Sequence, residues 1–263
     1  DSLVAWLKAM QQPDGGFLEA VDFYNKKNLP WGTMSALEPT YWAVKTLKML
    51  GTEPDRPGDA VRFIKARQRP SGAFDAYEVS WGGAREALYS TFWAVAALKE
   101  MGEPIPDSAG IVQWAGSMQD TRALRGGFRL SVDNFNYSST SGTYYGVRTL
   151  ALLGAAPKRP REVKKFLLSS YGQEADGGFE LGHGDNWNNF DHYSLMQDTY
   201  MALNTLEILG MPLRDSDTSR AARPAADCAR WIASLQNPDG GFARIGGTDQ
   251  TPLSSPSEMR ATW

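Results

Sequence analysis

The segment WIASLQNPDGGF (Trp231–Phe242) decides the fold, because four earlier stretches of the chain repeat its pattern. In each copy a short amphipathic stretch ends at a glutamine, and a glycine-containing turn then leads to a phenylalanine. The apolar residues before the glutamine have the spacing of one helix face, as in Cys228, Trp231, Ile232 and Leu235. The fourth copy fits this spacing only if Tyr171 takes the place of the glutamine. The five glutamines are Gln11, Gln68, Gln119, Gln173 and Gln236, and the five phenylalanines are Phe17, Phe74, Phe128, Phe179 and Phe242.

A second helical pattern follows each turn, after a loop of variable sequence. It reads TYWAVKTLKMLG at Thr40–Gly51, and its closing glycine suits the position just after a helix. The same pattern returns at Thr91–Gly102, Thr143–Gly154 and Thr199–Gly210, and begins again at Arg260–Trp263. We name the helix before each turn helix A and the helix after it helix B.

The order of helix A, turn, loop and helix B predicts an all-α protein, since no segment alternates with the period of a strand. We expect a single domain of four complete repeats plus half of a fifth. The predicted repeats span residues 1–51, 58–102, 107–154, 160–210 and 220–263.

Composition excludes several other classes of protein. One cysteine, Cys228, allows neither an internal disulfide framework nor a thiolate zinc cluster. A net charge of -3 argues against a dedicated nucleic-acid binder, and no apolar run is long enough to span a bilayer. No targeting segment is visible, which predicts a cytoplasmic protein. The chain nevertheless starts abruptly inside a helical pattern, so removal of a preceding segment stays an open alternative.

The Gln-x5-Phe element with its glycines resembles the QW-type repeat of squalene and oxidosqualene cyclases. Its alternation with helix B resembles the β subunits of protein farnesyl- and geranylgeranyltransferases, and the resemblance covers the whole chain. It implies an α/α toroid whose inner helices line a central cavity that holds an isoprenoid. A full ring of this kind has more helix pairs than this chain, so a second domain or subunit would complete it.

The zinc site of the protein prenyltransferases does not carry over to this sequence. That family holds zinc through an Asp-x-Cys before one helix B and a histidine before a later one. The aligned positions here hold Ala87 and Tyr89, or Ser139 and Ser141, and Asp198 stands in place of the histidine. We therefore expect no metal site and no cofactor, with zinc disfavoured and magnesium left open.

The acid of the squalene-hopene cyclases is retained only in part. Those enzymes protonate an alkene with the middle acid of an Asp-x-Asp-Asp motif. The matching stretch ends in Gln197 and Asp198, so only the last acid is kept and Gln197 stands at the protonating position. Asp198 is our best candidate for a catalytic acid, and a helix-capping carboxylate is its alternative role.

The loops before the B helices carry the other candidate residues. Together these loops hold seven more acidic than basic residues, which disfavours a bare diphosphate and suits a neutral polyene, a cation or a sugar. Aromatic side chains there could stabilise positive charge. Asp191 and His192 could form a proton-transfer pair. The catalytic candidates are Asp198, Asp191, His192 and Glu38, and the ligand-binding candidates are Trp31, Trp81, Tyr89, Tyr137, Asp185, Trp187, Tyr193 and Gln197.

These observations favour a toroid that binds an isoprenoid or another apolar ligand in an aromatic cavity. If the protein is an enzyme, its activity resembles that of a terpene cyclase without the standard acid motif and without the prenyltransferase zinc. Two alternatives stay open: a carbohydrate-active α/α toroid that uses paired acids, and a non-catalytic binding or half-cyclase domain.

Overall fold

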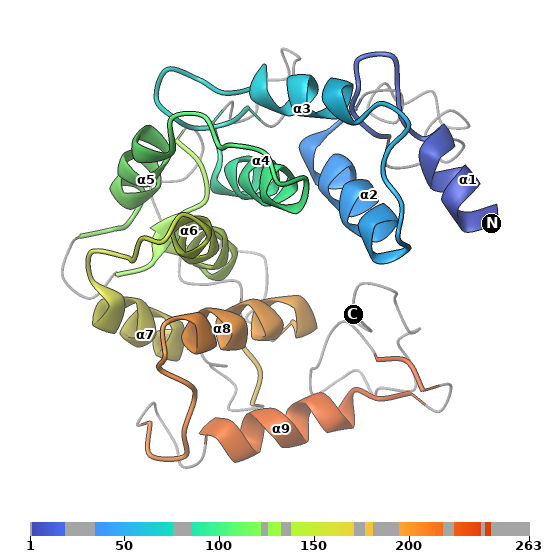
Figure 1. Ribbon diagram of the computed structural model, residues 1–263. Coiled ribbons are helices and arrows are strands. Elements are labelled where there is room, and N and C mark those ends of the chain that lie inside the picture. The colour runs from blue at the N-terminus through green and yellow to red at the C-terminus, as the bar shows by residue number, and fades with distance from the viewer. Residues whose placement is uncertain are drawn as a thin grey trace. The chain divides into compact units, whose positions relative to one another are not determined.

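The computed structural model describes residues 2–18, 35–75, 86–121, 126–132, 138–170, 177–180, 195–217, 224–237 and 240–242. Helices dominate these ranges (Figure 1). The chain divides into two compact units. Unit 1 comprises Asp1–Ser117, Ser131–Asn134 and Leu152–Ala155, and unit 2 comprises Met118–Leu130, Phe135–Ala151 and Ala156–Trp263. Each unit is described by itself below.

Unit 1 contains two B helices that lie side by side, α2 (Leu37–Met49) and α4 (Leu88–Glu100). Near their first turns the rings of Tyr41 and Phe92 are 6.2 Å apart, and near their last turns Lys48 Nζ donates to the Glu100 carbonyl at 2.6 Å. The two helices are therefore parallel. The A helices of this unit are α1 (Ser2–Ala9), α3 (Pro57–Lys65) and α5 (Ser108–Ser117).

Unit 2 holds the B helices α6 (Thr140–Leu152) and α8 (Met196–Ile208) and the A helices α7 (Pro160–Ser169) and α9 (Pro224–Ser234). It also contains a two-stranded antiparallel pair, β1 (Phe128–Arg129) with β2 (Ser138–Ser139). The helical prediction is confirmed, but it missed these strands. Two residues are too few to show a strand period in the sequence, and backbone hydrogen bonds alone define the pair.

The B helices begin three residues earlier than the sequence predicted: α2 starts at Leu37 and not at Thr40. The threonine lies inside the first turn, where its Oγ1 donates to the carbonyl of Ala36 at 2.6 Å. The same oxygen accepts the backbone N–H of Phe17, so the turn is fastened to the start of helix B.

The same pair of hydrogen bonding groups recurs at four places in the described residues. Each phenylalanine is fully buried, so its backbone N–H needs a partner inside the protein, and a threonine hydroxyl supplies it. The four N–H to Oγ1 distances are 3.0 Å for Phe17 to Thr40, 3.0 Å for Phe74 to Thr91, 2.9 Å for Phe128 to Thr143 and 2.9 Å for Phe179 to Thr199.

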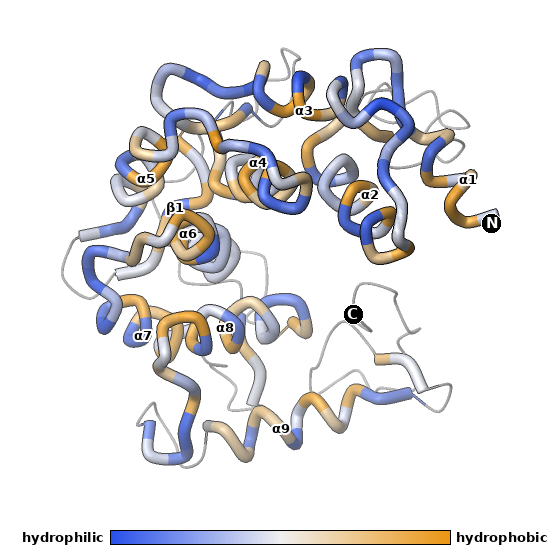
Figure 2. The backbone as a smooth tube through the Cα atoms, viewed as in Figure 1, coloured by the Kyte–Doolittle hydropathy of each residue, from blue (hydrophilic) through white to orange (hydrophobic). Residues whose placement is uncertain are grey.

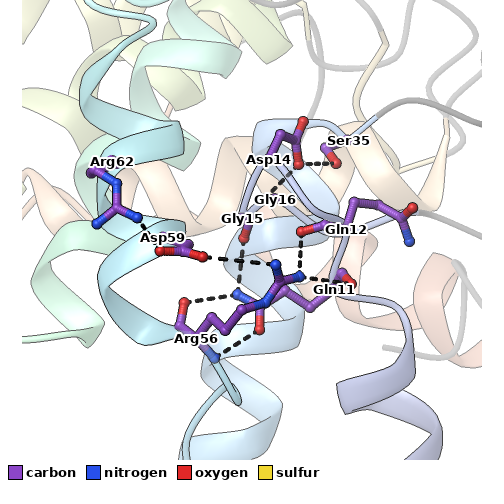
Figure 3. Close-up of polar contacts among 9 residues, drawn as sticks. All are labelled: Gln11, Gln12, Asp14, Gly15, Gly16, Ser35, Arg56, Asp59 and Arg62. Carbon is purple, nitrogen blue, oxygen red and sulfur yellow. Dashed lines mark hydrogen bonds and ion pairs between the residues drawn. The ribbon is translucent and has the colours of Figure 1, made fainter.

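The glutamine at the end of helix A ties its own turn to the following helix A. Figure 3 shows Gln11 Nε2 donating to the Gly15 carbonyl at 3.1 Å and to the Arg56 carbonyl at 2.9 Å. The Arg56 N–H returns a bond to Gln11 Oε1 at 3.0 Å, just before α3 begins. Gln119 makes the same three contacts, with Gly126 and Arg159. One amide side chain thus links consecutive repeats.

In the fourth repeat a backbone hydrogen bond of the turn is described. The N–H of Glu180 bonds to the carbonyl of Ser170 at 2.9 Å, as the N–H of Leu18 bonds to that of Met10 at 3.2 Å. Ser170 therefore occupies the position of Met10. Tyr171, like helix B of the fifth repeat, lies outside the described residues, so the repeat count stays a prediction.

Hydrophobic and polar segments alternate along α3, α7 and α9, as amphipathic helices require (Figure 2). The buried side of α3, for example, consists of Ala60, Phe63 and Ile64. Within the described ranges no helix has the length and apolar character needed to cross a bilayer.

Candidate functional site

Three of the predicted site residues, Glu38, Tyr89 and Gln197, occupy one equivalent position. Each is the second residue of its B helix, two residues before the clamping threonine, and Ser141 fills this position in α6. Glu38 and Gln197 are exposed, and Tyr89 and Ser141 are half-buried. We call these four residues the entry positions.

The entry positions hold a different residue in each B helix, whereas the residues next to them build the repeat. In α2 and α4 the preceding residues, Leu37 and Leu88, are buried in the core, and the threonines hold the turns. Glu38 and Tyr89 lie at the same end of the parallel α2–α4 pair. A protein that keeps a rigid scaffold and varies one position per helix end can place binding groups there.

Asp198 is the third residue of α8, directly after an entry position, and only 3% of its surface is exposed. The equivalent residue in α4 is Ser90, whose Oγ donates to the Phe74 carbonyl at 2.7 Å and to the Ala87 carbonyl at 2.9 Å. The carbonyl oxygens around Ser90 favour a side chain that carries a proton. The helix N-terminus acts in the opposite direction and favours a carboxylate.

A contiguous set of aromatic rings on the B helices was missed by the sequence analysis, which looked for them in the loops. In unit 1 the ring centroids of this set are 4.7–6.2 Å apart, and most of the rings are buried. Such contacts hold neighbouring B helices together. The visible signal was an aromatic residue directly after each threonine: Tyr41, Phe92, Tyr144 and Tyr200.

Two basic residues on the B helices were also missed. Lys45 and Arg148 stand five residues after the threonines of α2 and α6. Lys45 Nζ donates to Tyr41 Oη at 3.0 Å and lies 5.4 Å from that ring's centroid, and Arg148 donates to Tyr144 Oη in the same way. Burial raises the pKa of Tyr144 to about 12, and the charge of Arg148 offsets only part of that effect.

The remaining candidates fall in loops outside the described residues, and their roles stay predictions. This also holds for the pairing of Asp191 with His192. Within the described ranges, no three His, Cys, Asp or Glu side chains gather into a group that could hold a metal ion. The candidates concerned are Trp31, Trp81, Tyr137, Asp185, Trp187, Asp191, His192 and Tyr193.

The family model of the prenyltransferase alpha-alpha toroid domain matches residues 1–86, 32–133 and 84–251. The chain belongs to this family. The predicted toroid class and the resemblance to terpene cyclases and prenyltransferases are thereby confirmed.

Two solved structures with the same fold are enzymes of different kinds. A variant of the type II terpene cyclase MstE from Scytonema, in complex with geranylgeranyl dihydroxybenzoate, has a TM-score of 0.58 at 14% identity. That alignment covers 91% of this chain and 63% of the cyclase chain. Candida albicans protein geranylgeranyltransferase-I, complexed with GGPP, has a TM-score of 0.63 at 16% identity, covering 97% of this chain and 74% of the other.

At these identities the likeness establishes the fold alone. The chain spans less than two thirds of the length of the cyclase, so the reaction and substrate of that enzyme do not transfer with the fold. Among curated proteins, none matches this sequence. The chemistry must therefore be argued from the chain's own residues.

Proposed function

We propose that this chain binds a long apolar ligand of the isoprenoid class, and that the entry positions of α2 and α4 contact one end of it. The family and the two isoprenoid-bound neighbours support the ligand class. The observation that carries the proposal is the common position of Glu38, Tyr89 and Gln197, which differ between repeats while the surrounding repeat residues keep their structural roles.

We further propose a terpene-cyclase-like reaction in which Asp198 supplies the proton to an alkene. A side chain at the position of Ser90 meets two carbonyl oxygens, and a carboxyl group can be accommodated there when it is protonated and donates. Burial of Asp198 also disfavours the charged carboxylate. We therefore assign the transfer of the proton to Asp198.

A binding measurement and a turnover measurement test the two parts separately. Quenching of intrinsic tryptophan fluorescence by a geranylgeranyl-bearing ligand should saturate for the parent chain. Binding should weaken for Tyr89→Ala, which removes an aromatic entry side chain. Failure of geranylgeranyl and squalene probes alike to bind would refute the ligand class.

Turnover is tested by incubating the chain with squalene or geranylgeranyl substrates in deuterated water. Deuterium should appear in a cyclised product of the parent chain and be lost in Asp198→Asn, with ligand affinity retained. Glu162→Gln is the matched control, because it also neutralises a carboxylate in the first turn of a helix, but at a residue outside the entry positions. Equal turnover by Asp198→Asn and the parent would refute the assignment of the acid.

A further inference from the structure

Two of the B helices carry a cationic side chain that donates to a tyrosine hydroxyl one turn earlier. In α2, Lys45 Nζ donates to Tyr41 Oη at 3.0 Å. In α6, Arg148 donates to Tyr144 Oη. The position of the cation therefore differs in charge between repeats, while the residue one turn before it is aromatic in each. In α2, α4, α6 and α8 this position holds Lys45, Ala96, Arg148 and Asn204.

Lys45 lies on the same face of α2 as the entry residue Glu38. The steps from Glu38 to Tyr41 and from Tyr41 to Lys45 are three and four residues, which places the three side chains in one row along the helix. At 1.5 Å per residue, Glu38 and Lys45 are separated by about 10 Å along the helix axis. A ligand that contacts Glu38 at one point can therefore contact Lys45 at another.

This row borders the aromatic rings that join α2 to α4. The ring centroid of Tyr41 is 5.1 Å from that of Trp93 and 6.2 Å from that of Phe92. Lys45 Nζ is 5.4 Å from the ring centroid of Tyr41 and 5.7 Å from that of Trp42. An ammonium group thus stands at the border of an aromatic, apolar surface, which suits a ligand with one charged end and an apolar body.

The charge of Lys45 is available to an anion. Within the described ranges its polar partner is a hydroxyl, and no carboxylate forms an ion pair with it. Lys48 on the same helix, by contrast, pairs with the Glu100 carboxylate at 3.8 Å. A hydroxyl satisfies a hydrogen bond but leaves the positive charge in place. Because Lys45 is half-buried, its charge is screened less than that of an exposed lysine.

The donors of this pair match a carboxylate. Tyr41 Oη accepts a bond from Lys45, so the hydroxyl proton of Tyr41 is directed to another acceptor. The ammonium group has two further protons. A carboxylate has two acceptor oxygens and a single negative charge, which one lysine neutralises. A diphosphate carries more charge than one lysine neutralises, and Glu38 in the same row would repel the excess.

We propose that Lys45 and Tyr41 bind the carboxylate of an isoprenoid acid, whose apolar chain runs along the aromatic rings toward the entry positions of α2 and α4. This site belongs to the proposed function and depends on it, because the apolar chain must bind at the same face. It adds a head group to the ligand class, which the entry positions by themselves do not specify.

Equilibrium binding of two ligands with the same apolar chain tests the site. Geranylgeranoic acid carries a carboxylate and geranylgeraniol a hydroxyl, and both are followed by quenching of tryptophan fluorescence at neutral pH. The parent chain should bind the acid about tenfold more tightly, because a hydrogen bond to a charged group is stronger than one to a neutral group.

Variants of the lysine assign the preference to this residue. Lys45→Met should lose the preference for the acid and keep the affinity for the alcohol, which shows that the variant is folded. Lys45→Arg should keep the preference. Lys158→Met is the matched control and should bind both ligands like the parent, because it also removes one positive charge, but from an exposed lysine outside the helices.

The outcomes separate this site from the proposed function. If neither ligand binds the parent chain, the proposed function is wrong and the carboxylate site is wrong with it. If both bind with equal affinity, an isoprenoid binds but the carboxylate site is wrong. A preference that survives Lys45→Met, or loss of both ligands in that variant, would overturn the site as well. Tighter binding of geranylgeranyl diphosphate than of the acid, lost in Lys45→Met, would assign the lysine to a phosphate instead.

Discussion

Replacing Gln119 by methionine tests whether the glutamine links consecutive repeats. The change keeps an unbranched side chain of similar length and removes the amide. Gln119 is 4% exposed and makes three hydrogen bonds: Nε2 to the Gly126 and Arg159 carbonyls at 3.0 and 3.2 Å, and Oε1 from the Arg159 N–H at 3.2 Å. Gln236→Met is the matched control, since that glutamine is exposed and makes one bond at 3.3 Å.

The expected loss follows from these contacts. A hydrogen bond contributes about 1 kcal/mol net, and a buried group left without a partner costs about 1–3 kcal/mol. Three bonds, with the Arg159 N–H losing its acceptor, give a loss of about 3 kcal/mol for Gln119→Met. The exposed amide of Gln236 can bond to water instead, so its loss should be about 0.5 kcal/mol.

Urea unfolding followed by circular dichroism and tryptophan fluorescence measures both losses. Hydrogen exchange supplies a local readout: the amide of Arg159 should exchange faster in Gln119→Met, because its acceptor is gone. Equal destabilisation by the two substitutions would refute the linking role. Unchanged exchange at Arg159 would refute it as well.

Three further outcomes are expected. Gly126→Ala should cost about 2 kcal/mol in chemical denaturation, because its methyl would lie 2.3 Å from a carbon of α7, and Gly210→Ala should cost about 1 kcal/mol or less. Burial by itself would raise the pKa of Asp217, but hydrogen bonds from Lys164, 2.8 Å away, and from a backbone N–H outweigh it and lower that pKa. Asp217→Asn should therefore lose about 1 kcal/mol at neutral pH, and the difference should vanish as acid titrates the folded-state carboxylate. The raised pKa of Tyr144 stabilises the fold fully below the ordinary tyrosine pKa, and this contribution is lost as pH rises through about 12. In a tyrosinate absorbance titration, Tyr144→Phe should remove the step near 12 and leave the earlier steps unchanged.

Much of the fold could be predicted because the repeat shows in the spacing of apolar residues and glycines that are close in the sequence. The apolar positions before Gln11 or Gln119 define helix A, and the glycine turn that follows stops it. The start of helix B was misplaced by three residues because the recurring pattern in the sequence begins at Thr40, whereas α2 begins at Leu37. Its hydroxyl instead bonds within the first turn and to Phe17, which is 23 residues away in the sequence.

The candidate site was predicted less completely. Glu38, Tyr89 and Gln197 were chosen for separate reasons, and only helix bounds revealed that they share one position in the repeat. Lys45 was passed over because an isolated lysine in a helix carries no sign of the tyrosine ring beneath it.

The sequence by itself determined the helical repeat, its turns and its family, since spacing along the chain fixes which side chains share a helix face. Only the tertiary structure decided what each position that recurs between repeats does. The glutamine Gln11 bonds to the start of the next helix A, and Gly15 lets the backbone of that helix approach closely. Such roles depend on which distant backbone atoms come into contact, and distances of that kind are set by packing rather than by sequence spacing.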